Sequence, residues 1–208
     1  DFSLSRGLGD VYKRQVLASE DVPEVFVIDD EMDITMYRIS YEMVSGNQGH
    51  WSDLSTEEIS TVRDLMDTMI PTPSGCFIQG FSQWPLKSIG VEHLSGINLR
   101  QEEINWISTK LTGDVQQEAL FSYLTELGCV LRPGFKYGCK WRVYDDDVAK
   151  SHAPWLLQPM TEAPVSWEQT CLSVRLAEGV HKKWVCGLKE DIGDWKFLHI
   201  KRWLPGRV

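Results

Sequence analysis

The chain of 208 residues is long enough for one large domain or two small ones, and its 42% hydrophobic residues, with nine tryptophans, predict a buried core. Its apolar runs are shorter than the roughly 18 residues of a membrane-spanning helix, so we expect a soluble protein. The net charge of −9 is uneven, since residues 1–131 carry −13 and residues 132–208 carry +4. Such asymmetry fits either a local phosphate-binding surface or two ordinary solvated surfaces.

The five cysteines are dispersed along the chain without a CxxC pair. This distribution is typical of a reducing compartment, where thiols serve as small core residues. We therefore expect a cytoplasmic protein without a structural zinc site or a cofactor.

Residues 1–15 lack periodicity, and Ser5–Gln15 resembles the conceptual translation of a sequencing adapter. We leave this stretch out of the fold prediction. If it is foreign, the natural protein began further upstream and the chain is a fragment.

Two apolar runs, 25–28 and 34–39, flank the acidic stretch Asp29–Asp33, a pattern that predicts a β-hairpin. A lone hairpin is marginal in water, so we expect it to pack on another element.

Helix and strand patterns alternate in the next segment. Ser55 and Glu58 fit a capping box at the start of a helix, and Pro71 and Pro73 follow its end. The expected elements are a helix over 56–69, a strand over 75–84 and a helix over 99–111.

Another helix is predicted from Gly113 to Leu127, with Gly128 as its C-terminal stop. Short β-like runs follow, interrupted by one helix that begins after a capping residue, Ser166. The expected elements are strands over 130–131, 137–144 and 154–158, a helix over 167–178, and strands over 183–188 and 195–203. This order predicts an α/β fold, in which an α+β N-terminal subdomain precedes a small mixed β-sheet flanked by helices.

Three motifs follow one another in the second half of the chain. They are Gly134-Phe135-Lys136-Tyr137-Gly138 with Trp141-Arg142-Val143-Tyr144, then Ser151-His152-Ala153-Pro154-Trp155-Leu156-Leu157, then Arg175-Leu176-Ala177-Glu178-Gly179-Val180-His181-Lys182-Lys183. The set resembles the archaeal-type tRNA-splicing endonucleases, or tRNA-intron endonucleases, whose motifs read GFKYG with (F/W)RVY, H(S/A)xxLV and RLAxxVRKK. Each motif alone is a weak signal, whereas the ordered set is specific.

The resemblance implies three catalytic residues, Tyr144, His152 and Lys182. The lysine is assigned to Lys182 because the family's catalytic lysine directly follows a Val-Arg pair, which reads Val180-His181 here. Taken singly, the same residues would be a boundary aromatic, a loop histidine and a lysine that complements a helix dipole.

The chemistry explains this combination of residue types. Intramolecular RNA cleavage needs a base for the 2′-hydroxyl, an acid for the departing 5′-oxygen and a cation for the phosphate. The resemblance assigns these roles to Tyr144, His152 and Lys182. Tyrosine has an ordinary pKa of about 10, so it acts as a base only beside a cation such as Lys182. Since the 2′-hydroxyl is already held beside the phosphorus, no metal is required.

The resemblance also implies an RNA clamp, in which two arginines sandwich a flipped-out base. Arg175 matches one of them. Arg202 is our choice for the other, with Lys201 as the alternative; ordinary surface roles for both arginines stay open.

Asp145-Asp146-Asp147 invites comparison with metal-dependent nucleases. Adjacent carboxylates on a turn point in different directions, and no matching E-x-K strand follows. We expect a solvated loop here and no metal site.

Many members of the family join an inactive repeat to a catalytic one. With residues 1–15 set aside as non-native, the resemblance suggests three further segments. They are 16–45 as the closing hairpin of an upstream repeat, 46–112 as the N-terminal subdomain of the catalytic repeat, and 113–208 as its C-terminal catalytic domain. A single-repeat subunit with an unusual N-terminus is the alternative.

The implied enzyme is a homo-oligomer, a homodimer of two-repeat chains, that excises introns from precursor tRNA at bulge–helix–bulge motifs. It leaves 2′,3′-cyclic phosphate and 5′-hydroxyl ends. The rival hypothesis is a non-catalytic RNA-binding subunit of the same assembly.

We expect the acidic turns Asp29–Asp33 and Lys189–Asp194 to dock on a cationic pocket of a neighbouring unit. The apolar strand 197–203 should pair with strand 34–39 rather than stay an exposed edge.

Overall fold

The computed structural model describes residues 23–28, 31–93, 95–114, 119–190 and 194–203, so the prediction for residues 1–15 lies outside the described residues. The chain folds into two compact units. Of the described residues, unit 1 contains those up to 44, those from 132 to 144 and those from 152 onward, and unit 2 contains those from 45 to 131 and from 145 to 151. The predicted ranges 46–112 and 113–208 concern repeats rather than spatial units, and they stay predictions.

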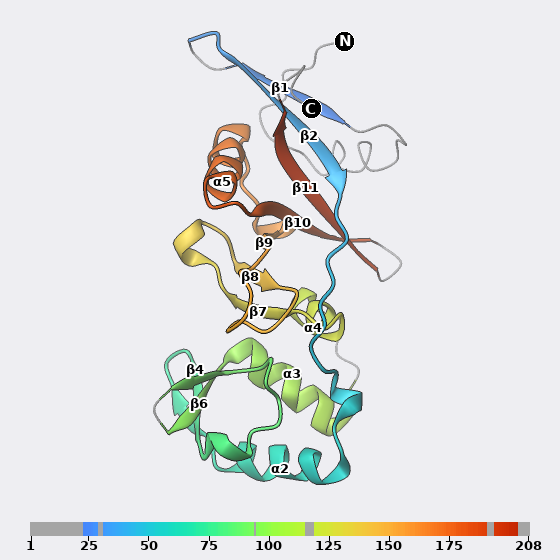
Figure 1. Cartoon of the computed structure of the whole chain (residues 1–208), viewed down its shortest axis with the longest axis vertical. Coiled ribbons are helices and arrows are strands. Elements are labelled where there is room, and N and C mark those ends of the chain that lie inside the picture. The colour runs from blue at the N-terminus through green and yellow to red at the C-terminus, as the bar shows by residue number, and fades with distance from the viewer. Residues whose placement is uncertain (1–22, 29–30, 94, 115–118, 191–193, 204–208) are drawn as a thin grey trace. The chain divides into compact units, whose positions relative to one another are not determined.

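Unit 1 is built on a seven-stranded sheet with the order β1-β2-β11-β10-β9-β8-β7 (Figure 1). The strands and helix of this sheet are β1 (Glu24–Ile28), β2 (Ile34–Tyr41), β7 (Val130–Pro133), β8 (Trp141–Tyr144), β9 (Trp155–Pro159), α5 (Trp167–Gly179), β10 (Lys183–Lys189) and β11 (Trp195–Trp203). Of β7, only the last two residues are assigned to unit 1. Short 3-10 turns occupy Phe135–Tyr137 and Met160–Glu162.

The sheet is mixed because β9 and β10 run parallel, whereas β8–β9, β10–β11, β2–β11 and β1–β2 run antiparallel. Parallel neighbours need a crossover connection, and α5 supplies it. The helix begins after Ser166, whose Oγ accepts a hydrogen bond of 3.3 Å from the Gln169 N–H. The predicted α/β fold with a small mixed sheet is confirmed.

One face of this sheet packs against α5. Cys171, Val174 and Ala177 of the helix contact side chains from β2, β9, β10 and β11, among them Tyr37 and Trp184. Trp184 is 2% exposed, and truncating such a side chain to alanine costs about 3–5 kcal/mol. The core therefore fixes which residues of each strand face the helix.

The hairpin β1–β2 joins the sheet through its second strand. Leu198 pairs with Tyr41 and Trp203 with Met36, so β11 and β2 run side by side over their length. This confirms the predicted pairing of the C-terminal strand with strand 34–39, and it gives the hairpin the packing that it was expected to need.

Unit 2 combines helices with a four-stranded antiparallel sheet of order β3-β4-β6-β5. Its elements are α2 (Thr56–Asp67), β3 (Ile70–Thr72), β4 (Gly75–Gln79), β5 (Val91–His93), β6 (Gly96–Arg100), α3 (Gln101–Thr112) and α4 (Leu120–Glu126), with 3-10 turns at Trp51–Asp53 and Phe81–Gln83.

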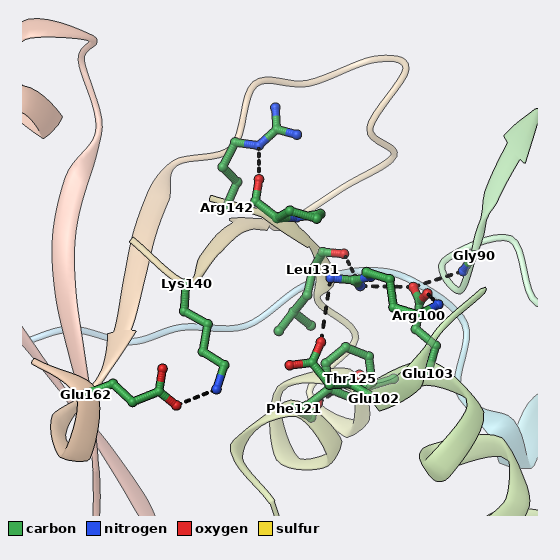
Figure 2. A network of polar contacts seen from close by, with 11 residues as sticks. Gly90, Arg100, Glu102, Glu103, Phe121, Thr125, Leu131, Lys140, Arg142 and Glu162 are labelled. Atoms are coloured by element: carbon green, nitrogen blue, oxygen red, sulfur yellow. Dashed lines mark hydrogen bonds and ion pairs between the residues drawn. The ribbon is translucent and has the colours of Figure 1, made fainter. Parts of the chain in front are cut away.

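A buried polar network joins β6 to α3 (Figure 2). The Glu103 carboxylate, 0% exposed, accepts hydrogen bonds from the Arg100 N–H at 2.8 Å, the Arg100 guanidinium at 3.0 Å and the Gly90 N–H at 3.0 Å. The guanidinium also donates to the Leu131 carbonyl at 3.0 Å. Because Glu103 is satisfied on both oxygens, its charge can be buried.

Several predicted elements are confirmed with shifted ends, and four predictions are wrong in part. The predicted strand 75–84 ends at Gln79, since Phe81–Gln83 form a 3-10 turn. Leu99 belongs to β6 and not to a helix, because α3 begins only at Gln101. Gly113 ends α3 with a left-handed φ of 75°, and the next helix starts only at Leu120, after the extended N-cap residue Ala119. The predicted strand 137–144 begins only at Trp141, since Phe135–Tyr137 form a 3-10 turn.

All five cysteines lie in the described part of the chain, where they are buried thiols outside any disulfide, as expected of core residues. In the described part of the chain, no helix is long and apolar enough to cross a membrane.

Candidate active site

Three neighbouring strands align their ends at one edge of the unit 1 sheet. Val143 of β8 pairs with Trp155 of β9, and Trp155 pairs with Lys183 of β10. The Lys183 N–H donates to the Pro154 carbonyl at 2.9 Å. This edge is therefore where β8 ends and where β9 and β10 begin.

The three predicted catalytic residues all lie at this edge. Tyr144 is the last residue of β8, His152 comes three residues before β9, and Lys182 comes directly before β10. The strand register thus brings together residues that are separated by up to 38 positions in the sequence.

Side chains that alternate along a strand share one face of the sheet. Arg142 is paired with Leu156, which packs against α5, so Tyr144 two residues later has the same orientation. Trp184 belongs to the same core, and Lys182 lies two residues before it. Tyr144, Lys182 and Arg142 therefore belong to the face of the sheet that α5 covers.

Lys182 is half-buried, and its Nζ donates a hydrogen bond of 2.5 Å to the Ala153 carbonyl. Burial lowers the pKa of Lys182, and the positive charge of Arg142 lowers it further. The contact with Ala153 places the lysine beside the residue that follows His152. Ala153 is buried, whereas His152 is exposed, so the imidazole is accessible from solvent.

Arg142 is a site residue to which the sequence analysis gave no role. Its guanidinium carbon lies 5.9 Å from the centroid of the Tyr144 ring. Its Nε donates to the Pro133 carbonyl at 3.1 Å, which fixes the side chain (Figure 2). A cation at this distance from a tyrosine ring can make a cation–π contact with it. Its place in the WRVY motif was visible in the sequence, but its nearness to Lys182 was not.

Arg175 and Arg202, the predicted clamp residues, lie on the α5 side of the sheet. Arg202 is paired with Tyr37, whose side chain packs against α5, and its N–H donates to Glu178 Oε1 at 2.9 Å. Arg175 lies one helical turn before Glu178, and both arginines are exposed. Lys201, the alternative, is paired with Arg38 and alternates to the other face.

The carboxylates of Asp146 and Asp147 accept hydrogen bonds within their own loop. Asp146 Oδ1 accepts from the Asp147 N–H at 2.7 Å, and Asp147 Oδ1 accepts from the Ala149 N–H at 2.9 Å. The hydrogen bond from Ala149 is the main reason why the pKa of Asp147 lies below its usual value. Among the described residues, no three His, Cys, Asp or Glu side chains are grouped so that they could hold a metal ion.

Residues 115–197 match the family model described as the tRNA intron endonuclease, catalytic C-terminal domain. This range includes β8, β9, α5 and β10, and with them all the residues that line up at the sheet edge.

The chain is also similar to curated archaeal proteins named tRNA-splicing endonuclease. Identity is 29% over 107 residues with that of Methanopyrus kandleri, covering 50% of this chain and 59% of the relative. It is 27% over 177 residues with that of Thermoplasma volcanium, covering 85% and 54%. It is 26% over 201 residues with that of Natronomonas pharaonis, covering 86% and 59%. The chain thus spans a little more than half the length of these relatives.

Proposed function

We infer that this chain, whose residues 115–197 match the model of the catalytic C-terminal domain of tRNA intron endonucleases, is the RNA-cleaving part of a tRNA-splicing endonuclease. The resemblance indicated by the three sequence motifs is confirmed by that match and by the archaeal relatives. The observation that carries the proposal is the strand register, which sets Tyr144, His152 and Lys182 at one edge of the sheet.

The proposed substrate is an intron-containing precursor tRNA with a bulge–helix–bulge motif, cut in the cytoplasm. Residues 132–208 have a net charge of +4, which favours binding of a phosphate backbone, although the whole chain has a net charge of −9. Arg175 and Arg202 would hold a flipped-out base between their guanidinium groups. Both side chains are exposed and belong to the same side of the sheet, which supports this role.

Cleavage is an intramolecular displacement at phosphorus. Tyr144 in its phenolate form takes the proton from the ribose 2′-hydroxyl and becomes a neutral phenol, and the 2′-oxygen forms a bond to phosphorus. The bond from phosphorus to the 5′-oxygen breaks, and His152 gives that oxygen a proton. The products are a 2′,3′-cyclic phosphate and a 5′-hydroxyl, and the reaction needs no metal ion.

The two cations of the site support the least favourable step, which is proton removal by a tyrosine. Lys182 and Arg142 would stabilise both the phenolate of Tyr144 and the negative charge that builds up on the phosphate. The nearness of Arg142 to the Tyr144 ring and its effect on Lys182 support this role.

The working enzyme is a homo-oligomer in which two such sites grip the two bulges of one RNA. In support, one face of the β1–β2 hairpin exposes Phe26, Ile28 and Ile34, each by more than half of its surface. Exposed apolar patches of this kind mark contacts with other chains or segments.

The proposal is tested by incubating the chain with an intron-containing precursor tRNA and measuring both intron release and RNA binding. We expect release of the intron by the parent and binding without release by the triple variant Tyr144→Phe, His152→Ala, Lys182→Met. Binding without cleavage by the parent would favour the non-catalytic subunit instead.

A further inference from the structure

Glu42 follows directly after β2, and its carboxylate joins three other elements. Glu42 Oε1 accepts hydrogen bonds from the Trp155 indole at 2.9 Å and from Lys183 Nζ at 2.7 Å. Glu42 Oε2 lies 3.8 Å from His199 Nδ1 on β11. The Glu42 side chain is 12% exposed and that of Lys183 is 50% exposed, so the carboxylate is largely shielded from water and the ammonium group only in part.

Trp155 and Lys183 are the first residues of β9 and β10 and are paired with one another in the sheet. They lie 113 and 141 positions from Glu42 in the sequence. A single carboxylate therefore bonds to the first residues of both strands, at the edge where the candidate site lies.

Glu42 acts from the side of the sheet opposite Lys182. Lys183 alternates with Lys182 and Trp184, which belong to the α5 face. The Glu42 carboxylate contacts Lys183 and Trp155. Within the described part of the chain, its hydrogen bonds and ion pairs do not include Lys182 or His152.

The local electrostatics keep Glu42 ionised. Burial alone would raise the pKa of Glu42, but the hydrogen bonds from Lys183 and Trp155 and the charge of Lys183 outweigh it, so the pKa lies below its ordinary value. Hydrogen bonds from these two donors to a shielded carboxylate are stronger than an ion pair in which both groups are exposed.

We propose that Glu42 is a positioning residue for RNA cleavage, an inference that rests on the function proposed above. His152 lies three residues before Trp155, and Lys182 lies one residue before Lys183. By holding the two strand starts, Glu42 sets the spacing between the acid and the cation. A misplacement of about 1 Å costs a catalytic constellation up to about 100-fold in rate.

The control for this proposal is an ion pair near the other end of β9. Lys140, directly before β8, pairs with Glu162, which follows β9. Glu162→Ala removes a carboxylate–lysine pair as Glu42→Ala does, but away from the candidate site.

In single-turnover cleavage of precursor tRNA, we expect Glu42→Ala to lower the rate about 10- to 100-fold. RNA affinity should stay within about two-fold, and Glu162→Ala should cleave like the parent. Parental cleavage by Glu42→Ala, or an equal loss in Glu162→Ala, would overturn the proposal. If Glu42→Ala does not fold, Trp155→Phe removes one of the two donors and should give a smaller loss of the same kind.

A second readout is independent of RNA. The Lys183 N–H, bonded to the Pro154 carbonyl at 2.9 Å, reports on the closure of β9 on β10 at this edge. We expect its hydrogen exchange to be about 10-fold faster in Glu42→Ala and unchanged in Glu162→Ala, which corresponds to a loss of about 1.4 kcal/mol in local stability. Unchanged exchange at Lys183 would refute the positioning role even if the parent cuts RNA. If the Lys183 N–H exchanges faster in Glu42→Ala but the parent does not cleave RNA, the proposed function is refuted. The role of Glu42 in holding β9 against β10 would still stand.

Discussion

Lys182 and Arg142 bring two positive charges to the sheet edge at which Tyr144 ends its strand. Each cation is held by a backbone carbonyl, Lys182 by that of Ala153 and Arg142 by that of Pro133. Charges that are fixed before the substrate arrives stabilise a transition state without the cost of reorientation. This preorganisation is the main contribution that single residues make to the proposed chemistry.

Arg142→Met should raise the pKa of Lys182. The pKa is lowered by burial and by the Arg142 charge, so removing the charge leaves burial alone and moves the value part of the way back. NMR titration of the Lys182 side chain measures this change. Lys140→Met, which removes a cation at the start of β8, serves as the control and should leave the value unchanged. An unchanged or lower pKa in Arg142→Met would show that the two cations do not interact.

His152→Ala should lower the single-turnover cleavage rate by roughly 10² to 10⁴, the usual contribution of a positioned general acid. RNA affinity should change little, because the imidazole acts on the leaving group. His93→Ala, at an exposed histidine of β5, is the control and should cleave like the parent. Equal losses in rate and affinity at position 152 would point to a phosphate contact instead of an acid.

Sequence patterns identified the candidate triad but could not identify the residues around it. Tyr144, His152 and Lys182 stand inside short motifs that carry their order with them. Glu42 has no motif of its own, and its partners lie 113 and 141 positions away. Its contacts arise from strand pairing, which local sequence does not determine.

At the scale of elements, the unit that positions the site is the crossover β9-α5-β10. The parallel pairing of β9 with β10 places His152 and Lys182 at one edge, and α5 covers the face to which Lys182 belongs. The strands and helix of this crossover were predicted from their apolar runs and the Ser166 cap, and they are confirmed.

The small sheet of unit 2 was largely missed, for two physical reasons. The strands β3 and β5 have three residues each, too few for an alternating pattern, and β3 contains Pro71. Leu99 lies on β6, but its spacing to Glu103 and Trp106 matched a helix that in fact begins two residues later. The N-cap of that helix is Arg100, a residue type that gives no capping signal.

The network that joins β6 to α3 should contribute strongly to stability. Glu103→Gln removes the charge that Arg100 faces in a buried site, and we expect a loss of about 3 kcal/mol in the free energy of unfolding. Urea unfolding measures it. Glu102→Gln is the matched control, since its carboxylate is 38% exposed and 3.8 Å from Arg100, and it should cost less than about 1 kcal/mol. Similar losses of unfolding free energy in both variants would contradict the claim that burial makes the Glu103–Arg100 ion pair the more important one.

At the scale of the whole molecule, the hairpin β1–β2 completes the sheet that carries the site. Its pairing with β11 was predicted because an apolar C-terminal strand makes an unfavourable free edge. The chain spans a little more than half of its curated relatives, so the assembly in which it works stays a proposal.

The acidic turn 29–33 provides a test of that assembly, although residues 29 and 30 lie outside the described residues. Replacing Asp29, Asp30 and Asp33 by asparagine removes three negative charges that a cationic pocket would receive. We expect a smaller assembly by light scattering and a loss of cleavage in the same samples. A variant of parental mass that cuts RNA at the parental rate would show that the turn has no docking role.

The most direct test of the account is the chemistry of the RNA ends. The chain is mixed with intron-containing precursor tRNA in EDTA, and the ends at both cut sites are identified by mass spectrometry. Attack by the 2′-oxygen, assisted by Tyr144, His152 and Lys182, predicts a 2′,3′-cyclic phosphate and a 5′-hydroxyl at the undiminished rate. A 3′-hydroxyl with a 5′-phosphate, formed only when magnesium is added, would contradict it.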